Sequence, residues 1–283
     1  MATRSALITG STGGIGGELA NQLSSQGWNL ILLNRSEQKT RAQLDQLELD
    51  FPAQAFSGYC ADFLEIEDLR RTVREIGAAH PRINAIYNNA GFLSGSRTLS
   101  AQNLEAHFAV NTVAPYLIVK ELVTNLAAAA AEGPQSVVIN VSSEVVTGVK
   151  SFDCSALADP PHIGGLLGAY AQSKLAANVF AQALKEPLAA QRVSILSVDP
   201  GATRTPMIDR GDGMPWFIKL LRPLLFKPVE QQVAALVGAV NASLEQRQSG
   251  VFISGGKVKP DSPFALDPGQ QNRMLTLLDG LIE

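Results

Sequence analysis

Short apolar runs of strand length alternate with longer segments of helical periodicity along most of the chain. The apolar runs are 6–9, 30–33, 55–60, 85–87, 137–141, 194–198 and 251–253, and the helical segments are 15–26, 36–49, 65–78, 100–131, 168–190 and 228–246. Strands that are apolar throughout are covered on both faces, and the intervening helices supply that cover. The alternation therefore predicts a single α/β domain over 1–283, built on a doubly wound parallel sheet with helices on both faces.

Composition and charge narrow the class of protein further. The chain has 283 residues, of which 46% are apolar and 17% charged, and its net charge is -3. This balance excludes a disordered chain, and without a basic excess we expect no nucleic-acid partner. Cys60 and Cys154 lie far apart, and His107 and His162 belong to no cluster, so we expect reduced thiols, no metal site and a cytoplasmic protein. We also expect no secretory signal and no transmembrane span.

Two segments interrupt the alternation, and both follow predicted strands. Segment 145–168 is rich in Gly, Pro, Ser and Asp, whereas segment 204–227 contains three prolines around an apolar centre. Doubly wound sheets bind ligands at the carboxyl ends of their strands, so we predict a substrate lid over 204–227. The apolar residues of 214–226 are also compatible with ordinary packing or with a surface that contacts membrane lipid.

The first predicted strand runs directly into a glycine-rich turn, Thr9-Gly10-Ser11-Thr12-Gly13-Gly14-Ile15-Gly16, and a helical pattern follows at once. Glycines permit a tight turn and a close approach to a pyrophosphate, and a helix N-terminus offers unpaired N–H groups and partial positive charge. The alternative is a glycine-rich loop without a ligand, but the strand–turn–helix context favours a dinucleotide site of the Rossmann type. The predicted contacts are Gly10, Ser11, Thr12, Gly14, Ile15 and Gly16.

Residues that follow the next three strands would complete this site. An acidic residue after 30–33 would favour NAD, but Arg35 stands there and can pair with the 2′-phosphate of NADP. We therefore predict NADP(H) over NAD(H), with a solvated surface arginine as the alternative. Asp62 either accepts a hydrogen bond from the adenine amino group or caps the helix that begins near Leu64. After the fourth strand, small residues would let the backbone approach the cofactor, unless they form an ordinary turn: Asn89, Ala90 and Gly91.

Tyr170 and Lys174 stand four residues apart in a helical segment, so they share one helix face. An ammonium beside a phenol lowers the pKa of the phenol, which would suit Tyr170 to proton transfer. Such a pair alone is usually a half-buried tyrosine beside a solvated lysine. Two further residues support a catalytic role. Ser143, after the strand 137–141, could stabilise charge on a substrate oxygen, and Asn111, in a helix that Pro115 can open, could hold a water.

Together these motifs resemble those of the short-chain dehydrogenase/reductases. The cofactor turn of that family is similar to Thr9-Gly10-x-x-x-Gly14-Ile15-Gly16, and its central-strand motif to Asn88-Asn89-Ala90-Gly91. Asn111, Ser143, Tyr170 and Lys174 also follow the family's order, and the resemblance covers residues 5 to 205. Ser143 and Tyr170 lie 27 positions apart, farther than in many members. This spacing, with Tyr170-x-x-Ser173-Lys174-Leu175-Ala176, resembles the retinol dehydrogenase-like branch.

The resemblance implies an NADP(H)-dependent oxidoreductase, a carbonyl reductase or alcohol dehydrogenase, that acts on a small apolar carbonyl or alcohol. Tyr170 would be the general acid or base, Lys174 would lower its pKa and bind the nicotinamide ribose, Ser143 would bind the substrate oxygen, and Asn111 would hold a water. Pro200, Gly201 and Thr205 would lie against the nicotinamide. One alternative is a non-catalytic dinucleotide sensor, which has no need of all four catalytic residues. Another is a sugar-nucleotide epimerase or dehydratase, which usually needs a longer C-terminal part. A homo-oligomer is left open.

Overall fold

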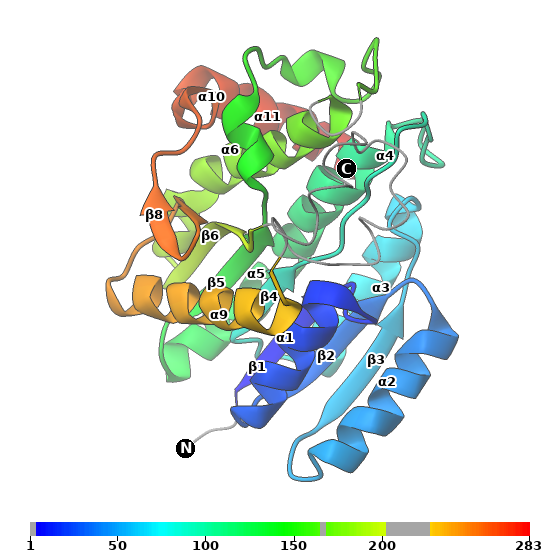
Figure 1. The fold of residues 1–283 in the computed structure, drawn as a ribbon, viewed down its shortest axis with the longest axis vertical. Coiled ribbons are helices and arrows are strands. Elements are labelled where there is room, and N and C mark those ends of the chain that lie inside the picture. The colour runs from blue at the N-terminus through cyan, green and yellow to red at the C-terminus, as the bar shows by residue number, and fades with distance from the viewer. Residues whose placement is uncertain (1–3, 165–167, 202–226) are drawn as a thin grey trace.

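The computed structural model describes residues 4–164, 168–201 and 227–283 of a single α/β domain (Figure 1). Thr205 and the predicted lid over 204–227, apart from Lys227, therefore lie outside the described residues. At the centre is an eight-stranded sheet in the order β3-β2-β1-β4-β5-β6-β7-β8. Its strands are β1 (Ser5–Thr9), β2 (Asn29–Asn34), β3 (Phe56–Cys60), β4 (Ala85–Asn88), β5 (Ser136–Val141), β6 (Val193–Asp199), β7 (Val251–Ser254) and β8 (Lys257–Lys259).

The first seven strands are parallel and agree with the seven predicted runs, whereas β8 was not predicted. It pairs antiparallel with β7 through a turn at Gly255 and Gly256, whose φ angles are 59° and 73°. Glycines with positive φ are what a tight hairpin requires. All three residues of β8 are exposed, so no apolar run marks this strand in the sequence. The predicted doubly wound parallel sheet is therefore confirmed, and β8 adds one antiparallel strand at its edge.

Helices cover both faces of the sheet. They are α1 (Gly14–Ser25), α2 (Glu37–Asp50), α3 (Ile66–Ala79), α4 (Ala106–Phe108), α5 (Ala114–Glu132), α6 (Ala169–Ala189), α9 (Val229–Glu245), α10 (Pro263–Leu266) and α11 (Pro268–Ile282). A π-helical turn, η1 (Ala109–Val113), joins α4 to α5, and two short 3-10 turns, η2 (Glu144–Gly148) and η3 (Cys154–Ala156), follow β5.

Alternate residues of each parallel strand serve two separate cores. Leu7 and Ile31 pack with α3, α5 and α6 on one face, whereas Ile8 and Leu30 pack with α1 and α9 on the other. This alternation is the period-2 geometry of a strand expressed within a continuous apolar run. The core therefore fixes the register of every parallel strand, and with it the position of each residue at the carboxyl edge of the sheet.

The C-terminal helices α10 and α11, drawn in orange-red to red in Figure 1, lie beside α6 and were not predicted. Met274 and Leu278 of α11 are fully buried against this face. The hydroxyl of Tyr116, on α5, donates to Oδ1 of Asp279 at 2.6 Å, and Nζ of Lys120 lies 3.1 Å from the same oxygen. The expectation of one helix after the predicted lid is therefore wrong, since α9, α10 and α11 all lie there.

The long helix through residues 106–132 is apolar enough, by length and composition, to cross a membrane. This one helix does not decide the expectation that the chain has no transmembrane span, which stays a prediction. About two thirds of its most apolar window is buried inside the fold. Its contacts with α3 and β5 account for that composition as a core helix.

The described part of the 145–168 segment packs against two other regions. On one side, Phe152 lies 6.2 Å from Phe264 between ring centres, and Sγ of Cys154 lies 3.2 Å from Oε1 of Gln270 on α11. On the other, the backbone N–H of Glu105 donates to the carbonyl of Ala158 at 2.8 Å. The segment thus connects the C-terminal helices to the loop between β4 and α4.

Candidate active site

The glycine-rich turn lies where the strand order reverses, between β1 and β4. Gly10 has a φ of 66°, and a Cβ atom added to it would lie 2.9 Å from Cα of Ala90. A Cβ on Gly16 would lie 2.4 Å from both Nδ2 of Asn89 and the carbonyl oxygen of Gly10. Both positions therefore need glycine for close packing of α1 on the turn and of the turn on the β4 loop. This switch point is where doubly wound sheets bind their ligands.

Side chains of Thr9 and Asn89 connect the two strand ends. Oγ1 of Thr9 accepts hydrogen bonds from the backbone N–H groups of Asn89 and Ala90 at 3.0 and 2.9 Å. In return, Nδ2 of Asn89 donates to the carbonyls of Thr9 and Gly10 at 2.9 and 3.0 Å. Asn88 instead donates to Asn140 of β5 at 2.9 Å. Asn89 therefore ties the β4 loop to the glycine-rich turn, and Asn88 ties the end of β4 to β5.

The residues around this turn fit a dinucleotide. The N-terminus of α1 carries no side-chain cap and no acidic residue in its first turn. A Cβ on Gly13 would meet no atom of the described residues within 4 Å. Uncapped N–H groups with no opposing carboxylate are suited to phosphate oxygens. Thr12 is exposed there, whereas the side chain of Ser11 is buried and bonded to Asn34 and Gln43.

Arg35 and Asp62 lie at the ends of β2 and β3 respectively. Arg35 is exposed and forms no ion pair with any residue that the structure describes. One oxygen of Asp62 accepts a hydrogen bond from the backbone N–H of Leu64 at 3.0 Å, in a turn before α3. That helix begins at Ile66, so Asp62 organises the approach to the helix and is not its cap. The second carboxylate oxygen of Asp62 accepts no hydrogen bond within this turn.

Ser143, Tyr170 and Lys174 meet at the carboxyl end of β5. The hydroxyl of Ser143 lies close enough to the phenol of Tyr170 to act on its pKa, which it lowers. Nζ of Lys174 donates to the carbonyl of Val141 at 2.7 Å and lies 6.0 Å from the centre of the Tyr170 ring. The neighbouring Ser142 faces away, because its hydroxyl donates to Asn178 at 2.9 Å. Of the two serines, Ser143 is therefore the one that interacts with Tyr170.

The electrostatics of this group differ from the expectation that Lys174 lowers the pKa of Tyr170. Burial raises the pKa of Tyr170 to about 12, although the Ser143 hydroxyl opposes that rise, and the charge on Asp199 adds to it. Burial also lowers the pKa of Lys174 to about 8. The physical reason is that both groups lose water, and the ammonium is directed at the carbonyl of Val141 and not at the phenol.

Asn111 lies in the π-helical turn η1, four residues before Pro115. The sequence predicted that Pro115 opens this helix. The structure shows the opening as a π-helical turn, which holds one more residue than an α-helical turn. Oδ1 of Asn111 accepts from the backbone N–H of Phe92 at 2.8 Å, and Nδ2 donates to the carbonyl of Phe92 and to Oγ of Ser173, both at 3.0 Å. The side chain therefore holds the β4–α4 loop against the turn of α6 that carries Tyr170.

His107 is a site residue that sequence reasoning did not assign. Its ring is fully buried and lies edge-to-face with Tyr170, with 6.3 Å between ring centres. Nε2 accepts a hydrogen bond from the backbone N–H of Ser94 at 3.0 Å, which leaves Nδ1 to donate to the buried carboxylate of Glu105 at 2.8 Å. The sequence offered one signal for this role: His107 stands four residues before Asn111, on the same helix face, and two residues after Glu105. Both side chains hold the same loop.

Of the three residues predicted against the nicotinamide, Pro200 and Gly201 follow β6 at the carboxyl edge of the sheet, and Thr205 lies outside the described residues. Gly201 has a φ of 82°, and its backbone N–H donates to Asp199 at 3.0 Å. A Cβ at this position would lie 2.5 Å from Nε2 of Gln232. The turn after β6 therefore requires glycine.

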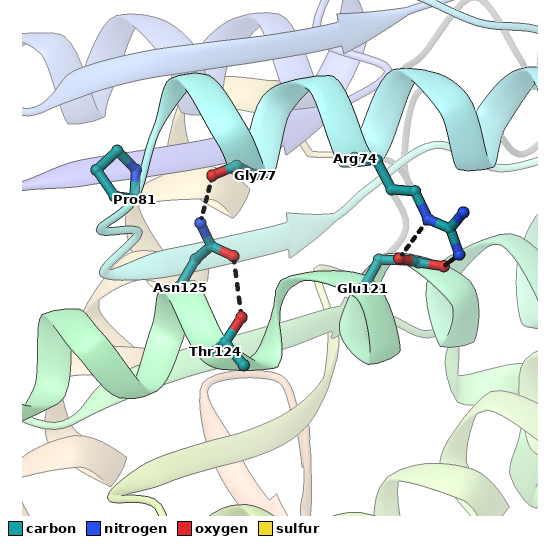
Figure 2. A pocket seen from close by; sticks show the side chains of 6 residues that line it. All are labelled: Arg74, Gly77, Pro81, Glu121, Thr124 and Asn125. Atoms are coloured by element: carbon teal, nitrogen blue, oxygen red, sulfur yellow. Dashed lines mark hydrogen bonds and ion pairs between the residues drawn. The ribbon is translucent and has the colours of Figure 1, made fainter.

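A hollow of about 410 Å³ lies away from this site, between α3 and α5 (Figure 2). Arg74 donates to both oxygens of Glu121 at 2.9 and 3.0 Å along its wall. Nδ2 of Asn125 donates to the carbonyl of Gly77 at 2.8 Å and also to that of His80, just before β4. This hollow is thus at the amino end of the sheet, opposite Tyr170. Among the described residues, no group of three or more His, Cys, Asp or Glu could hold a metal.

Comparison with known proteins agrees with this geometry. The family model for short chain dehydrogenases matches residues 4–212. Dehydrogenase/reductase SDR family member 13 of Homo sapiens is 30% identical over 278 residues, which cover 96% of this chain and 71% of the relative. Retinol dehydrogenase 13 of Mus musculus is 27% identical over 292 residues, covering 96% of this chain and 82% of the relative.

The fold is also that of a solved structure, the NADPH-bound carbonyl reductase from chicken fatty liver. That structure has a TM-score of 0.71 at 21% identity and covers 92% of this chain and 99% of its own. The family match spans the glycine-rich turn, the β4 loop and all of Asn111, Ser143, Tyr170 and Lys174. The chain therefore belongs to the short-chain dehydrogenase/reductase family, and its similarity to retinol dehydrogenase 13 groups it with the retinol dehydrogenase-like branch.

Proposed function

We propose that this oxidoreductase transfers a hydride between NADP(H) and an apolar carbonyl or alcohol, with Tyr170 as the general acid or base. The observation that carries the proposal is the pair of Ser143 and Tyr170 at the carboxyl end of β5, with Nζ of the buried Lys174 6.0 Å from the centre of the Tyr170 ring. This pair lies at the same sheet edge as the glycine-rich turn. A dinucleotide sensor would need the turn alone, so the buried and costly Lys174 favours an enzyme.

The protein's own part in the reaction is positioning and proton transfer. The hydroxyl of Ser143 would donate a hydrogen bond to the substrate oxygen and stabilise the charge that develops there. In reduction, Tyr170 would give its proton to that oxygen, and its high pKa keeps the proton in place until the oxygen becomes basic. Lys174 would hold the ribose hydroxyls of the dinucleotide, and Asn111 would keep the helix turn open for a water that reaches Lys174. The dinucleotide, when bound, supplies the hydride.

NADP(H) is preferred in this proposal because of Arg35. Its guanidinium is exposed beside the glycine-rich turn and has no carboxylate partner among the described residues, so it is available for a phosphate. Thr12, Gly14 and Ile15 would lie along the phosphates, and Asp62 would reach the adenine through its second oxygen. Solved structures with the same fold hold NADPH, NADP or NADH, so the fold supports a nicotinamide dinucleotide, and the preference for NADP(H) rests on Arg35.

An apolar substrate is supported by the branch to which the chain belongs and by residues beside Tyr170. Phe92, clamped by Asn111, lies 5.0 Å from the ring of His107. Phe152 packs on the C-terminal helices near the same end of the sheet. The relative named retinol dehydrogenase 13 has by its name an apolar alcohol substrate. A panel of apolar aldehydes, ketones and alcohols is therefore the first to assay.

Replacement of Tyr170 tests the mechanism. Tyr170→Phe removes only the hydroxyl, so turnover of the best substrate in the panel should fall by about a hundredfold or more. The affinity for NADPH, measured by fluorescence titration, should change by less than about twofold. Tyr59→Phe is the matched control, because Tyr59 lies on the edge strand β3 and bonds to His80, and it should keep full turnover. If Tyr170→Phe retained most of its turnover, the proposed mechanism would be wrong.

Replacement of Arg35 tests the cofactor. Arg35→Ala should raise the KM for NADPH about tenfold, the cost of one charge-assisted hydrogen bond, and leave the KM for NADH within about twofold. Arg41→Ala is the control, because Arg41 is exposed on α2 and pairs with Asp45. The prediction also requires the unmodified protein to have a lower KM for NADPH than for NADH. The reverse order would contradict it.

A further inference from the structure

Asn178 lies two helical turns after Tyr170 on α6, and its side chain is fully buried. Its amide bonds to two distant parts of the chain. Oδ1 of Asn178 accepts a hydrogen bond from the hydroxyl of Ser142 at 2.9 Å, and Nδ2 donates to Oδ1 of Asp261 at 3.0 Å. One side chain thus joins the end of β5, the helix of Tyr170 and the loop between β8 and α10.

The carboxylate of Asp261 determines which way this amide points. An ionised carboxylate only accepts hydrogen bonds, so the amide nitrogen of Asn178 must face Asp261 and the amide oxygen must face Ser142. Two further donors hold the carboxylate itself: the backbone N–H of Ser262 at 2.8 Å and Nε2 of Gln182, on α6, at 3.3 Å. Asn178 is therefore left with one orientation, in which its acceptor faces β5.

Two successive turns of α6 are attached to two successive residues at the end of β5. Nζ of Lys174 donates to the carbonyl of Val141 at 2.7 Å, and Asn178, one turn later on the same helix face, accepts from Ser142. A shift of the helix along the strand would break both hydrogen bonds together. The pair of contacts therefore fixes the position of α6 on β5.

This position bears directly on the proposed catalytic groups. Ser143 directly follows Ser142, whose backbone N–H donates to the carbonyl of Val198 on β6 at 2.9 Å. Tyr170 stands one turn before Lys174 on the attached face of the helix. With one residue held in the sheet and the other carried by the helix, the attachment between helix and strand sets how Tyr170 lies relative to Ser143.

We propose that Asn178, oriented by Asp261, is a positioning residue that sets the Tyr170 phenol against the Ser143 hydroxyl. The inference rests on the proposed function, since these two groups would hold the substrate oxygen. It goes beyond that function by giving the loop between β8 and α10 a part in the rate of the reaction. A displacement of reacting groups by about 1 Å can cost about a hundredfold in rate.

Two variants remove the attachment from opposite sides: Ser142→Ala deletes one hydroxyl, and Asn178→Ala deletes the amide. Each should lower kcat for the best substrate in the panel by about tenfold or more, with less than about a threefold change in the affinity for NADPH. Because both variants lose the same bond, the double variant should lose less than about twofold more than Asn178→Ala. Asn125→Ala is the matched control, because this buried asparagine also donates two hydrogen bonds, at the amino end of the sheet, and it should keep full kcat.

Hydrogen exchange of the full chain tests the attachment without any substrate. The peptides covering 137–145 and 169–175 should exchange about tenfold faster in Asn178→Ala than in the unmodified protein. Asp261→Ala should have the same effect, because the amide of Asn178 is then free to turn over. Asp261→Asn can keep an oxygen toward Asn178, so it should retain most of the protection. Asn125→Ala should leave both peptides unchanged.

Unchanged kcat in both Ser142→Ala and Asn178→Ala would overturn the inference, and so would unchanged exchange in the two peptides. An equal loss of kcat in Asn125→Ala would also overturn it, because a general loss of stability would then be the cause. If Asn178→Ala does not fold, Ser142→Ala decides the kinetic result and Asp261→Ala the exchange result. Full turnover in Tyr170→Phe, or no turnover of any substrate in the panel, would instead refute the proposed function, and the exchange result still decides the attachment.

Discussion

The amino group of Lys174 is buried and, among the residues that the structure describes, makes one hydrogen bond, to the carbonyl of Val141. Its side chain is 5% exposed, and burial lowers its pKa from 10.5 to about 8. A shift of that size corresponds to at most about 3 kcal/mol of destabilisation by the charged form. Asn111 and Ser143, by contrast, satisfy their polar atoms within the protein. Lys174 is therefore the residue at which stability and the proposed function conflict most directly.

We expect Lys174→Met to stabilise the protein at pH 7 by about 1–2 kcal/mol while abolishing turnover. The expected gain in stability is smaller than the full destabilisation caused by the charged amino group, because the carbonyl of Val141 loses its hydrogen-bond donor. Since the folded-state pKa lies below the unfolded value, the penalty is fully present below pH 8 and is relieved as the pH rises from about 8 toward 10.5. Urea unfolding at pH 7 and pH 9.5 should therefore show a smaller gain at the higher pH. A pH-independent difference would argue against this origin.

At the scale of elements, the helix formed by α4, η1 and α5 holds the β4–α4 loop through two side chains. Asn111 binds both backbone groups of Phe92, and His107 binds the N–H of Ser94. His107 and Asn111 are four residues apart and so lie on one face of the helix, one turn apart. Their partners, Ser94 and Phe92, are two residues apart, so both point the same way from an extended loop. The loop that borders Tyr170 is therefore held in place by the helix and not by its own secondary structure.

The His107 contact predicts a specific pattern of loss and rescue. His107→Ala leaves the Ser94 N–H and the Glu105 carboxylate short of a partner, so we expect a loss of about 1–3 kcal/mol in stability and about tenfold in kcat/KM, mainly through KM. His107→Gln can keep an acceptor for Ser94 and a donor for Glu105, so it should recover most of both. Steady-state kinetics and urea unfolding of the two variants provide the measurement. Equal losses in both would show that the ring itself matters.

At the scale of the whole molecule, the sequence predicted the parallel part of the fold well because its strands are buried on both faces and read as apolar runs. Members of the predicted site also converge, since the carboxyl ends of parallel strands meet at one edge. The sequence did not predict α10 and α11, which follow the polar hairpin of β8. Contacts between distant parts of the chain stabilise them, through Tyr116, Lys120 and Asp279. Such pairings leave no local periodicity to read.

Asp261 and His107 escaped the sequence reading for a related reason. Their importance lies in partners far away in sequence, such as Asn178 for Asp261, and in burial that composition does not reveal. The pKa of Tyr170 was misjudged in the same way, because the spacing of Tyr170 and Lys174 fixes their proximity but not the loss of water around both. Sequence spacing predicts which residues lie close together, whereas burial determines the pKa values of their titratable groups.

The packing of α1 on α9 and of α6 on α11 has a consequence for how the protein matures on the ribosome. The glycine-rich turn and its partners on β4 lie within the first 90 residues, but α1, which follows the turn, packs against α9 near the other end of the sequence. Asp199 likewise gains its Ser254 partner, and α6 its contacts with α11, only after β7 and α11 have been synthesised. Neither the cofactor turn nor the helix of Tyr170 can therefore complete its packing until the C-terminal part of the chain has left the ribosome.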